Sequence, residues 1–134
     1  MRALLTSSCF ALVAIAATAQ DASAMIQCGM ASWYGTEAGT RRADGGSVDA
    51  SALTAAHRSL PFGTKVKVEN LENGREATVE INDRGPFTRT RVIDVSKGTA
   101  KELDFVGDGV ARVRITTIEG VDEKEIAAAA KKCP

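Results

Sequence analysis

Residues 82–87, Asn-Asp-Arg-Gly-Pro-Phe, place a carboxylate where it could act as an acid and base. Asp83 follows residues 75–81, in which apolar and polar residues alternate as in a half-buried strand, and it precedes a Gly-Pro turn. The strand pattern resumes at residues 91–95, so Asp83 is predicted to lie on a loop between two strands. Loops on a rigid sheet often carry function, and one carboxyl group there can donate a proton and later accept one.

A structural role for Asp83 is the alternative, because aspartate often caps such a turn and the adjacent Arg84 can pair with it. An aspartate that donates a proton near neutral pH needs surroundings that disfavour its charge. An Arg84 side chain pointing the same way would oppose that effect. Turned inward, Arg84 would instead tie down the loop or bind a carboxylate of a substrate.

The elements that would position these residues are mainly strands. Strand patterns separated by Gly, Pro, Asn and Asp occur at residues 30–34, 52–56, 64–69, 75–81, 91–95 and 110–118. Six short strands favour a small barrel, and Asn73-Gly74 predicts a hairpin between the third and fourth. Ser96 is predicted to cap a short helix through Leu103 that closes one end of the barrel, and residues 122–132 are predicted to form a C-terminal helix.

Several other residues have two interpretations or a plain structural one. Residues 36–49 form a long Gly-rich and charged loop, which is expected either to line a groove or to be solvated surface. Phe62 and Phe87 are expected in the core. Asp94 lies within an apolar strand and is expected to be a buried hydrogen-bonding residue, with a place in the groove as the alternative.

The N-terminal residues 1–24 have the pattern of a signal peptide: Arg2, a short apolar stretch, and small residues suited to cleavage. The apolar stretch is shorter than the about 20 residues that span a membrane, so no stable membrane anchor is expected. The sequence around Cys28 does not support lipidation. The mature domain, residues 25–134, is therefore expected to be exported, periplasmic or secreted.

Cleavage after residue 24 would leave two cysteines, Cys28 and Cys133, near opposite ends of a chain in an oxidising compartment. A disulfide between them is predicted, with two unpaired thiols as the alternative. Such a bond would close a loop of roughly 100 residues, which the chain-entropy model values at about 4 to 5 kcal/mol.

Composition excludes some classes of function. The chain has 17 Lys and Arg against 17 Asp and Glu, so nothing favours a nucleic-acid partner. With one histidine, and with two cysteines assigned to the predicted disulfide, no metal site is expected. No cofactor is expected, and the protein is expected to be a monomer.

Four blocks in fixed order carry a resemblance to a known family. They are residues 31–35 (Ala-Ser-Trp-Tyr-Gly), 53–64 (from Leu-Thr-Ala-Ala-His to Leu-Pro-Phe-Gly-Thr), 82–87, and 91–96 (Arg-Val-Ile-Asp-Val-Ser). Together they resemble the RlpA (rare lipoprotein A) family over roughly residues 30–118. The resemblance implies a six-stranded double-psi β-barrel, the fold shared with expansins, with a short helix between strands five and six and a C-terminal helix.

The resemblance also implies a function and site residues. Members similar to this chain bind peptidoglycan glycan strands and act on them as lytic transglycosylases, forming 1,6-anhydro-muramic acid ends. Asp83 matches the essential aspartate and His57 matches the histidine of the groove. His57 is expected to hydrogen-bond a sugar or to orient Asp83, although a lone histidine is more often packed. Trp33 and Tyr34 offer ring faces for a sugar or for the core, and strand alternation predicts one inward and one outward.

One departure from the family bears on this function. The family usually carries an acidic residue where this chain has Gly46. Asp44, Asp49 and Glu37 lie near enough in sequence to be considered as displaced carboxylates. A lytic transglycosylase can nevertheless work with one carboxyl group, because the 6-hydroxyl of the sugar itself attacks the anomeric centre. The expected function is therefore an exported lytic transglycosylase with Asp83 as general acid and base, and the alternative is a noncatalytic, expansin-like peptidoglycan binder. A small secreted structural or inhibitory domain ranks below both.

Overall fold

The computed structural model describes residues 24–35, 42–47, 49–129, 131 and 133. Within them, six strands and two short helices occur in the order β1, β2, β3, β4, β5, α1, β6, α2. The strands are β1 (Ile26–Tyr34), β2 (Thr54–Ala56), β3 (Lys65–Asn70), β4 (Glu76–Asp83), β5 (Arg91–Ser96) and β6 (Val110–Thr117), and the helices are α1 (Lys97–Glu102) and α2 (Glu123–Ala129). Residues 1–23 of the expected signal peptide lie outside the described part.

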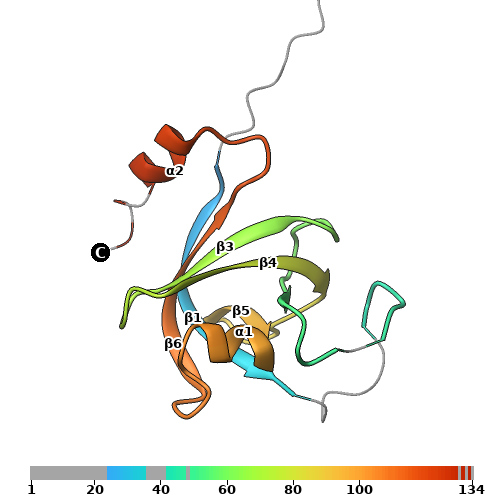
Figure 1. The fold of residues 1–134 in the computed structure, drawn as a ribbon. Coiled ribbons are helices and arrows are strands. Elements are labelled where there is room, and N and C mark those ends of the chain that lie inside the picture. The colour runs from blue at the N-terminus through green and yellow to red at the C-terminus, as the bar shows by residue number, and fades with distance from the viewer. Residues whose placement is uncertain (1–23, 36–41, 48, 130, 132, 134) are drawn as a thin grey trace, which may run out of the picture.

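The six strands form a closed barrel in the spatial order β1-β5-β2-β4-β3-β6 (Figure 1). The pairs β1/β5 and β2/β4 are parallel, whereas the other neighbours are antiparallel. Each parallel pair therefore joins strands that are separated in the chain by other elements. This is the predicted double-psi β-barrel, so the mainly β fold class is confirmed.

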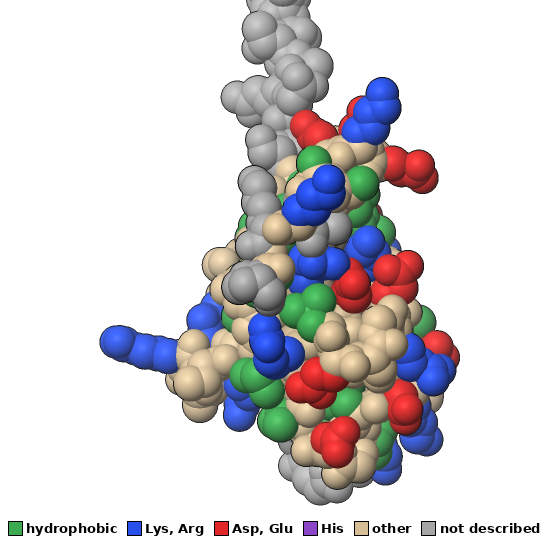
Figure 2. All heavy atoms as spheres, turned by 90° about the vertical axis from the view of Figure 1, so that its left-hand side faces the viewer, with side chains coloured by type: hydrophobic (Ala, Val, Ile, Leu, Met, Phe, Trp, Pro, Cys, Tyr) green, Lys and Arg blue, Asp and Glu red, His purple; other side chains and the backbone are tan. Residues whose placement is uncertain are grey.

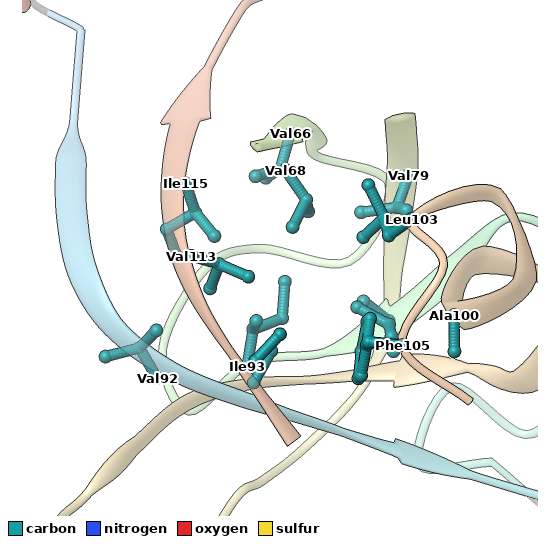
Figure 3. Packing of buried hydrophobic residues seen from close by; sticks show 14 of the residues in the cluster. Val66, Val68, Val79, Val92, Ile93, Ala100, Leu103, Phe105, Val113 and Ile115 are labelled. Atoms are coloured by element: carbon teal, nitrogen blue, oxygen red, sulfur yellow. The ribbon is translucent and has the colours of Figure 1, made fainter. Parts of the chain in front are cut away.

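Apolar alternation accounts for the core. In β3, Val66 and Val68 point inward between half-buried Lys65, Lys67 and Glu69, as the period of two requires. The residues that meet inside the barrel include Val79, Ile81, Ile93, Val95, Val113 and Ile115, each at most 1 % exposed (Figure 3). The barrel interior is thus filled by side chains, and any ligand site must lie outside it.

Helix α1 closes one end of this core, as predicted. Ser96 is its N-cap and accepts a hydrogen bond from the backbone N–H of Thr99. Ala100, Leu103 and Phe105 pack into the barrel interior (Figure 3). The carbonyl oxygen of Leu103 accepts hydrogen bonds of 2.9 Å from the side-chain amides of Asn70 and Asn73, which lie in the β3–β4 hairpin. The predicted hairpin therefore also fixes the end of the helix.

Some predicted boundaries were wrong. Strand β4 continues through Asp83, which was predicted on a loop, because Ala56 of β2 pairs with it in parallel across an irregularity in register. Strand β1 begins at Ile26 instead of residue 30, because β6 pairs with its first half. Helix α2 spans Glu123–Ala129, shorter than the predicted 122–132, of which residues 130 and 132 are outside the described part.

A disulfide joins Cys28 of β1 to Cys133, as the sequence predicted, with Cα atoms 6.0 Å apart. It ties the segment after α2 to the barrel. Figure 2 shows acidic and basic side chains interspersed on the side of the molecule that carries α2. None of the helices in the described part is long and apolar enough to cross a membrane.

Candidate active site

Strand register gathers the candidate residues on the outside of the barrel. Ser32 of β1 pairs with Asp94 of β5, Asp94 pairs with Ala56 of β2, and Ala56 pairs with Asp83 of β4. We call these four residues the carboxylate row. Asp83 and Asp94 flank Ala56 on neighbouring strands, so their backbones lie about two strand spacings, roughly 10 Å, apart. Two carboxyl groups are thereby presented on one face.

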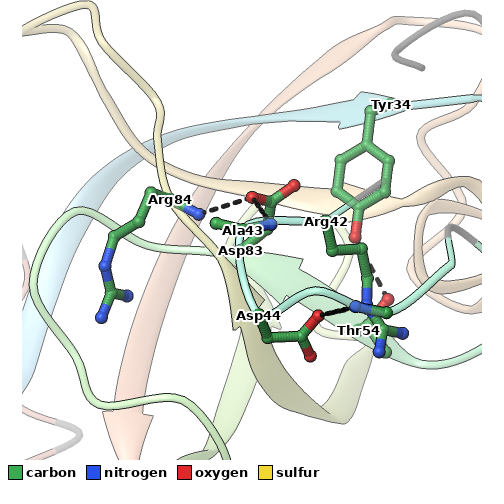
Figure 4. Close-up of polar contacts among 8 residues, drawn as sticks. Tyr34, Arg42, Ala43, Asp44, Thr54, Asp83 and Arg84 are labelled. Atoms are coloured by element: carbon green, nitrogen blue, oxygen red, sulfur yellow. Dashed lines mark hydrogen bonds and ion pairs between the residues drawn. The ribbon is translucent and has the colours of Figure 1, made fainter. Parts of the chain in front are cut away.

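The Asp83 side chain is held through one of its oxygens. Oδ1 accepts hydrogen bonds from the backbone N–H groups of Ala43, at 3.0 Å, and Arg84, at 2.8 Å (Figure 4). Its backbone oxygen accepts another from the N–H of His57, at 3.1 Å. Among the described residues Oδ2 has no hydrogen-bond partner. Asp83 is therefore fixed in orientation through Oδ1, and Oδ2 is left without a partner in the described part of the chain.

The Arg84 side chain points away from Asp83 (Figure 4). Its Nη1 donates hydrogen bonds to the backbone oxygens of Leu60, at 2.8 Å, and His57, at 3.3 Å. Its guanidinium lies over the ring of Phe62, with Cζ 4.0 Å from the ring centroid. The predicted alternative in which the Arg84 side chain pairs with Asp83 does not occur. Arg84 ties down the loop after β2, and its charge is directed there and not at the carboxylate.

A second arginine makes the reciprocal connection. Arg58 follows β2, and its Nε donates a 2.8 Å hydrogen bond to the backbone oxygen of Pro86. Its Nη2 donates to the backbone oxygens of Thr88 and Arg91. Arg58 thus holds the segment after β4, while Arg84 holds the segment after β2. We call Arg58 and Arg84 the crossed arginines, and they lock together the two loops that flank Asp83.

His57 is 4 % exposed and uses both ring nitrogens inside the protein. Nδ1 accepts hydrogen bonds from the backbone N–H groups of Ser59 and Leu60, both at 3.1 Å. Nδ1 is therefore unprotonated and Nε2 carries the hydrogen, which it donates to Oε1 of Gln27 at 3.1 Å. Burial, and secondarily the charges of the crossed arginines, lowers the pKa of His57. The bond from His57 to Asp83 comes from the backbone N–H and not from the ring, and both ring nitrogens are engaged elsewhere, so the geometry suits positioning better than contact with a sugar.

Trp33 and Tyr34 point in opposite directions, as strand alternation predicted. Trp33 packs against the core, and its Nε1 donates a 3.2 Å hydrogen bond to the backbone oxygen of Val106. The Tyr34 hydroxyl makes a 3.1 Å hydrogen bond with Oγ1 of Thr54, on the side of Asp83 (Figure 4). Burial raises the pKa of Tyr34 against the lowering effect of the Thr54 hydrogen bond, and the negative charge of Asp83 raises it further. Of the pair, Tyr34 belongs to the site.

Asp94 lies on the same face as Asp83, which fits the alternative in which it faces the groove. Its Oδ1 accepts a 2.6 Å hydrogen bond from Oγ of Ser32. Arg91 forms an ion pair with the same oxygen, with its Nε 3.1 Å away. This contact does not have the geometry of a hydrogen bond. The side chain is 20 % exposed, so it is not the buried residue that was expected. The alternation of residues 91–95 was the available signal, since Asp94 faces away from buried Ile93 and Val95.

At Gly46, where the resemblance to the RlpA family implies an acidic residue, the space is taken by the side chain of Arg42. A Cβ at Gly46 would lie 2.0 Å from Nη2 of Arg42, so the Arg42 guanidinium occupies that space. Nε of Arg42 donates to Oδ1 of Asp44 at 2.9 Å, and the N–H of Gly46 donates to the same oxygen (Figure 4). These contacts, the Arg42 hydrogen bond foremost, lower the pKa of Asp44. Asp49 instead accepts hydrogen bonds from the N–H and the hydroxyl of Ser51, so both aspartates make contacts within the loop.

Glu37, the third displaced carboxylate considered, lies outside the described residues, as do residues 38–41 and 48 of the long loop. Within the described part no group of three or more His, Cys, Asp and Glu side chains could hold a metal ion.

The expectation that Phe62 and Phe87 lie in the core was wrong. Phe62 is 42 % exposed and Phe87 is 88 % exposed. The interior is already filled by aliphatic residues and Phe105, whereas both phenylalanines belong to the loops linked by the crossed arginines. Phe62 covers the guanidinium of Arg84.

A family model described as "Lytic transglycolase" matches residues 26–115. The chain belongs to this lytic transglycolase family. The match takes in strands β1 to β5 in full, β6 through Ile115, and every residue of the carboxylate row. The resemblance to the RlpA family is confirmed by relatives of that name.

Over the aligned stretch, about half of the residues are identical between this member of the lytic transglycolase family and its relatives. A protein of Nostoc sp. named "Probable endolytic peptidoglycan transglycosylase RlpA" is 56 % identical over 93 residues, 67 % of this chain and 25 % of the relative. Two relatives are named "Endolytic peptidoglycan transglycosylase RlpA". The one from Campylobacter jejuni is 48 % identical over 67 % of this chain and 33 % of the relative. The one from Pseudomonas aeruginosa is 47 % identical over 76 % of this chain and 29 % of the relative. This family member thus spans only a quarter to a third of these relatives' length.

Solved structures resemble this lytic transglycolase family member in fold. The Streptomyces papain inhibitor is 22 % identical with a TM-score of 0.57, covering 70 % of this chain and 96 % of the inhibitor. An expansin of Clavibacter michiganensis, solved in complex with cellohexaose, is 19 % identical with a TM-score of 0.57. The likeness covers 71 % of this chain and 51 % of the expansin. At these identities the likeness shows the shared barrel alone.

Proposed function

We propose that residues 25–134 form an exported domain that cleaves peptidoglycan glycan strands as a lytic transglycosylase. The observation that carries the proposal is the state of Asp83: one oxygen is held by two backbone N–H groups, and the other is free beside a second carboxylate. The names of the relatives support the substrate, since each is called a peptidoglycan transglycosylase.

In the proposed reaction, protonated Asp83 donates its proton to the glycosidic oxygen as the bond from C1 of the muramic acid to that oxygen breaks. The ionised Asp83 then accepts the proton of the C6 hydroxyl, whose oxygen bonds to C1. The products are the released hydroxyl end and a 1,6-anhydro ring. No water is consumed, and Asp83 ends protonated as it began, so one carboxyl group suffices.

The other residues have separate parts in this proposal. The carboxylate of Asp94 stabilises positive charge at C1 in the transition state. Tyr34 borders the substrate with its ring, whereas Trp33 supports the sheet from the core side. His57 and the crossed arginines act as positioning residues, because their polar atoms are engaged with the loops beside Asp83. Their contribution is to hold the free oxygen of Asp83 in one place.

A noncatalytic, expansin-like binder is the second candidate, and Gly46 favours it. Where the family carries an acid, this chain has no side chain and places the Arg42 guanidinium there. A binder would use the same surface and the same carboxylates for hydrogen bonds to the glycan. The two functions therefore differ in turnover and not in ligand.

Export is proposed from two features of the chain. The leader pattern of residues 1–24 predicts cleavage before the barrel, and the Cys28–Cys133 disulfide suits an oxidising compartment. A peptidoglycan substrate would require the same location.

The test compares the protein with its Asp83→Asn variant on isolated peptidoglycan, with and without stem peptides. Released fragments with 1,6-anhydro ends are identified by mass spectrometry. Asp108→Asn, which removes an exposed carboxylate from the loop before β6, is the matched control and should retain full activity. Anhydro products from the protein and the control, but not from Asp83→Asn, are expected. Sedimentation with peptidoglycan and no products from any of the three would favour the binder.

A further inference from the structure

Phe87 is the most exposed of the large hydrophobic residues in the described part of the chain. It is 88 % exposed, whereas the others in this group, Leu53, Phe62 and Val110, are 42 to 45 % exposed. Leaving a whole phenyl ring in water forgoes the stabilisation that burial of the ring would give, on the order of 2 kcal/mol. A single exposed apolar residue needs no explanation by itself, so its position and its support decide the matter.

The ring of Phe87 lies beside the carboxylate row. A Cβ built on Gly85 would be 3.6 Å from Cε2 of Phe87 and 4.0 Å from Oδ2 of Asp94. The ring and the second carboxylate therefore border the same point, the place where a side chain at position 85 would begin. Gly85 has a φ of 124°, which residues with a side chain rarely adopt, so this gap is built into the turn that follows Asp83.

The backbone on both sides of Phe87 is fixed. Arg58 donates hydrogen bonds to the carbonyl oxygen directly before Phe87, that of Pro86, and to the one directly after it, that of Thr88. A third bond reaches the carbonyl of Arg91 at the start of β5. The ring is thus presented by a rigid segment, and only its own rotamer remains to be ordered when a ligand binds. Preorganisation of this kind reduces the entropic cost of binding.

We propose that Phe87 is a stacking platform for a pyranose ring of the glycan strand, in a subsite that adjoins the carboxylate row. The inference rests on the proposed function for the identity of the ligand. One face of a pyranose in a β-linked glycan presents aliphatic C–H groups, which can cover a phenyl ring, while hydroxyl groups at the sugar's edge can donate to Oδ2 of Asp94. Arg58 is then a positioning residue that acts through the backbone of the Phe87 loop.

The experiment measures binding of β-1,4-linked N-acetylglucosamine hexamer and of isolated peptidoglycan in the Asp83→Asn background, so that the glycan is not consumed. Phe87→Ala and Phe87→Leu are both expected to weaken binding by about tenfold, because leucine is apolar but offers no flat face. Phe87→Trp should bind within about twofold of the parent or more tightly, since it keeps an aromatic face. Thr88→Ala, an exposed neighbour whose backbone carbonyl is unchanged, should bind as the parent does.

A second variant, Arg58→Ala, tests the support of the Phe87 loop separately from the ring. It should weaken binding of both probes while leaving the phenyl ring in the chain, and a thermal melt identifies any loss of folding. In the active protein, Phe87→Leu should raise KM about tenfold and leave kcat nearly unchanged, because the platform lies beside the reacting atoms and does not touch them.

Two results would overturn the inference: Phe87→Leu binding both probes as tightly as the parent, or Phe87→Ala altering only self-association in sedimentation velocity. Neither result depends on turnover. A protein that forms no anhydro products but loses glycan binding in Phe87→Leu would refute the lytic reaction and support the platform. A protein that forms them with unchanged binding and KM in Phe87→Leu would support the reaction and refute the platform.

Discussion

Removal of the Cys28–Cys133 disulfide should destabilise the barrel far more than the contacts of the C-terminal segment would suggest. The two cysteines are 105 residues apart in sequence, so the bond closes almost the whole domain into one loop. The chain-entropy model gives about 4 to 5 kcal/mol for a loop of that length, because the crosslink removes conformations from the unfolded chain. The whole free energy of unfolding of a small domain is only about 5 to 15 kcal/mol. We therefore expect the variant Cys28→Ser/Cys133→Ser to be folded but near the margin of stability.

The assay is equilibrium unfolding in guanidinium chloride, followed by the fluorescence of Trp33, the only tryptophan. With a slope of about 3 kcal/mol per molar denaturant, the midpoint should fall by roughly 1 to 2 M. The slope itself should rise, because the unfolded chain without the crosslink exposes more surface. Cys28 is exposed, so its replacement by serine leaves no cavity that would explain the loss.

Two controls separate the crosslink from the side chains. Cys133→Ser alone should match the double variant, and the unsubstituted protein under a reductant should match both. A thiol titration of the unfolded, unreduced domain of residues 25–134, which lacks Cys9, should find no free thiol. A loss below about 1 kcal/mol, together with two free thiols, would refute the reasoning and support the alternative of unpaired cysteines.

Three further predictions concern the site. Gly46→Glu should increase the release of anhydro products at least about tenfold, because it places a carboxyl group in a space that the flexible Arg42 side chain can vacate. Gly46→Gln, which adds no acid, should leave the rate unchanged. Equal rates in the two variants would mean that an acid at this position does not limit the reaction. Burial lowers the pKa of His57 below 6.5, so as the pH falls the imidazole takes up a proton in the unfolded chain before it does so in the folded protein. The free energy of unfolding should therefore decrease as the pH falls from about 6.5 through the pKa of the folded state. His57→Gln should lack that part of the slope in unfolding midpoints measured between about pH 7 and 5, and an unchanged slope would count against the assignment. Arg84→Ala should lower the free energy of unfolding by about 1 to 2 kcal/mol, measured by chemical unfolding. Arg84→Lys should restore less than half of that loss, because lysine lacks the planar guanidinium that contacts two carbonyl oxygens and the Phe62 ring. Full restoration by lysine would contradict this reasoning.

The sequence predicted the local features of the fold well. Alternation in residues 64–69 identified β3, Asn73-Gly74 identified the hairpin, and Ser96 identified the N-terminus of α1. Each of these signals depends on residues a few positions apart. The family blocks then supplied the topology, which alternation alone leaves open because a period of two does not say which strands pair.

The errors concern contacts between distant segments. Asp83 belongs to a strand because of its partner Ala56, and Ala56 also pairs with Asp94, which places both carboxyl groups on one face. The Gln27–His57 hydrogen bond joins residues 30 positions apart, and no local pattern indicates it. Hydrophobicity predicted a buried Phe87, although the barrel interior has no room for it once the aliphatic residues and Phe105 are placed.

The strand order also has a consequence for how the protein acquires its site. Strand β1 pairs with β5 and β6, so Met30 meets Arg91 and Ile26 meets Thr116, which are 61 and 90 positions away. Chains dominated by such distant pairings fold slowly, on the order of milliseconds to seconds. The carboxylate row runs through both parallel pairs, and so it is complete only when the barrel has closed. A nascent or partly folded chain would carry Asp83 without its surroundings, and any activity against glycan would begin only with the last step of folding.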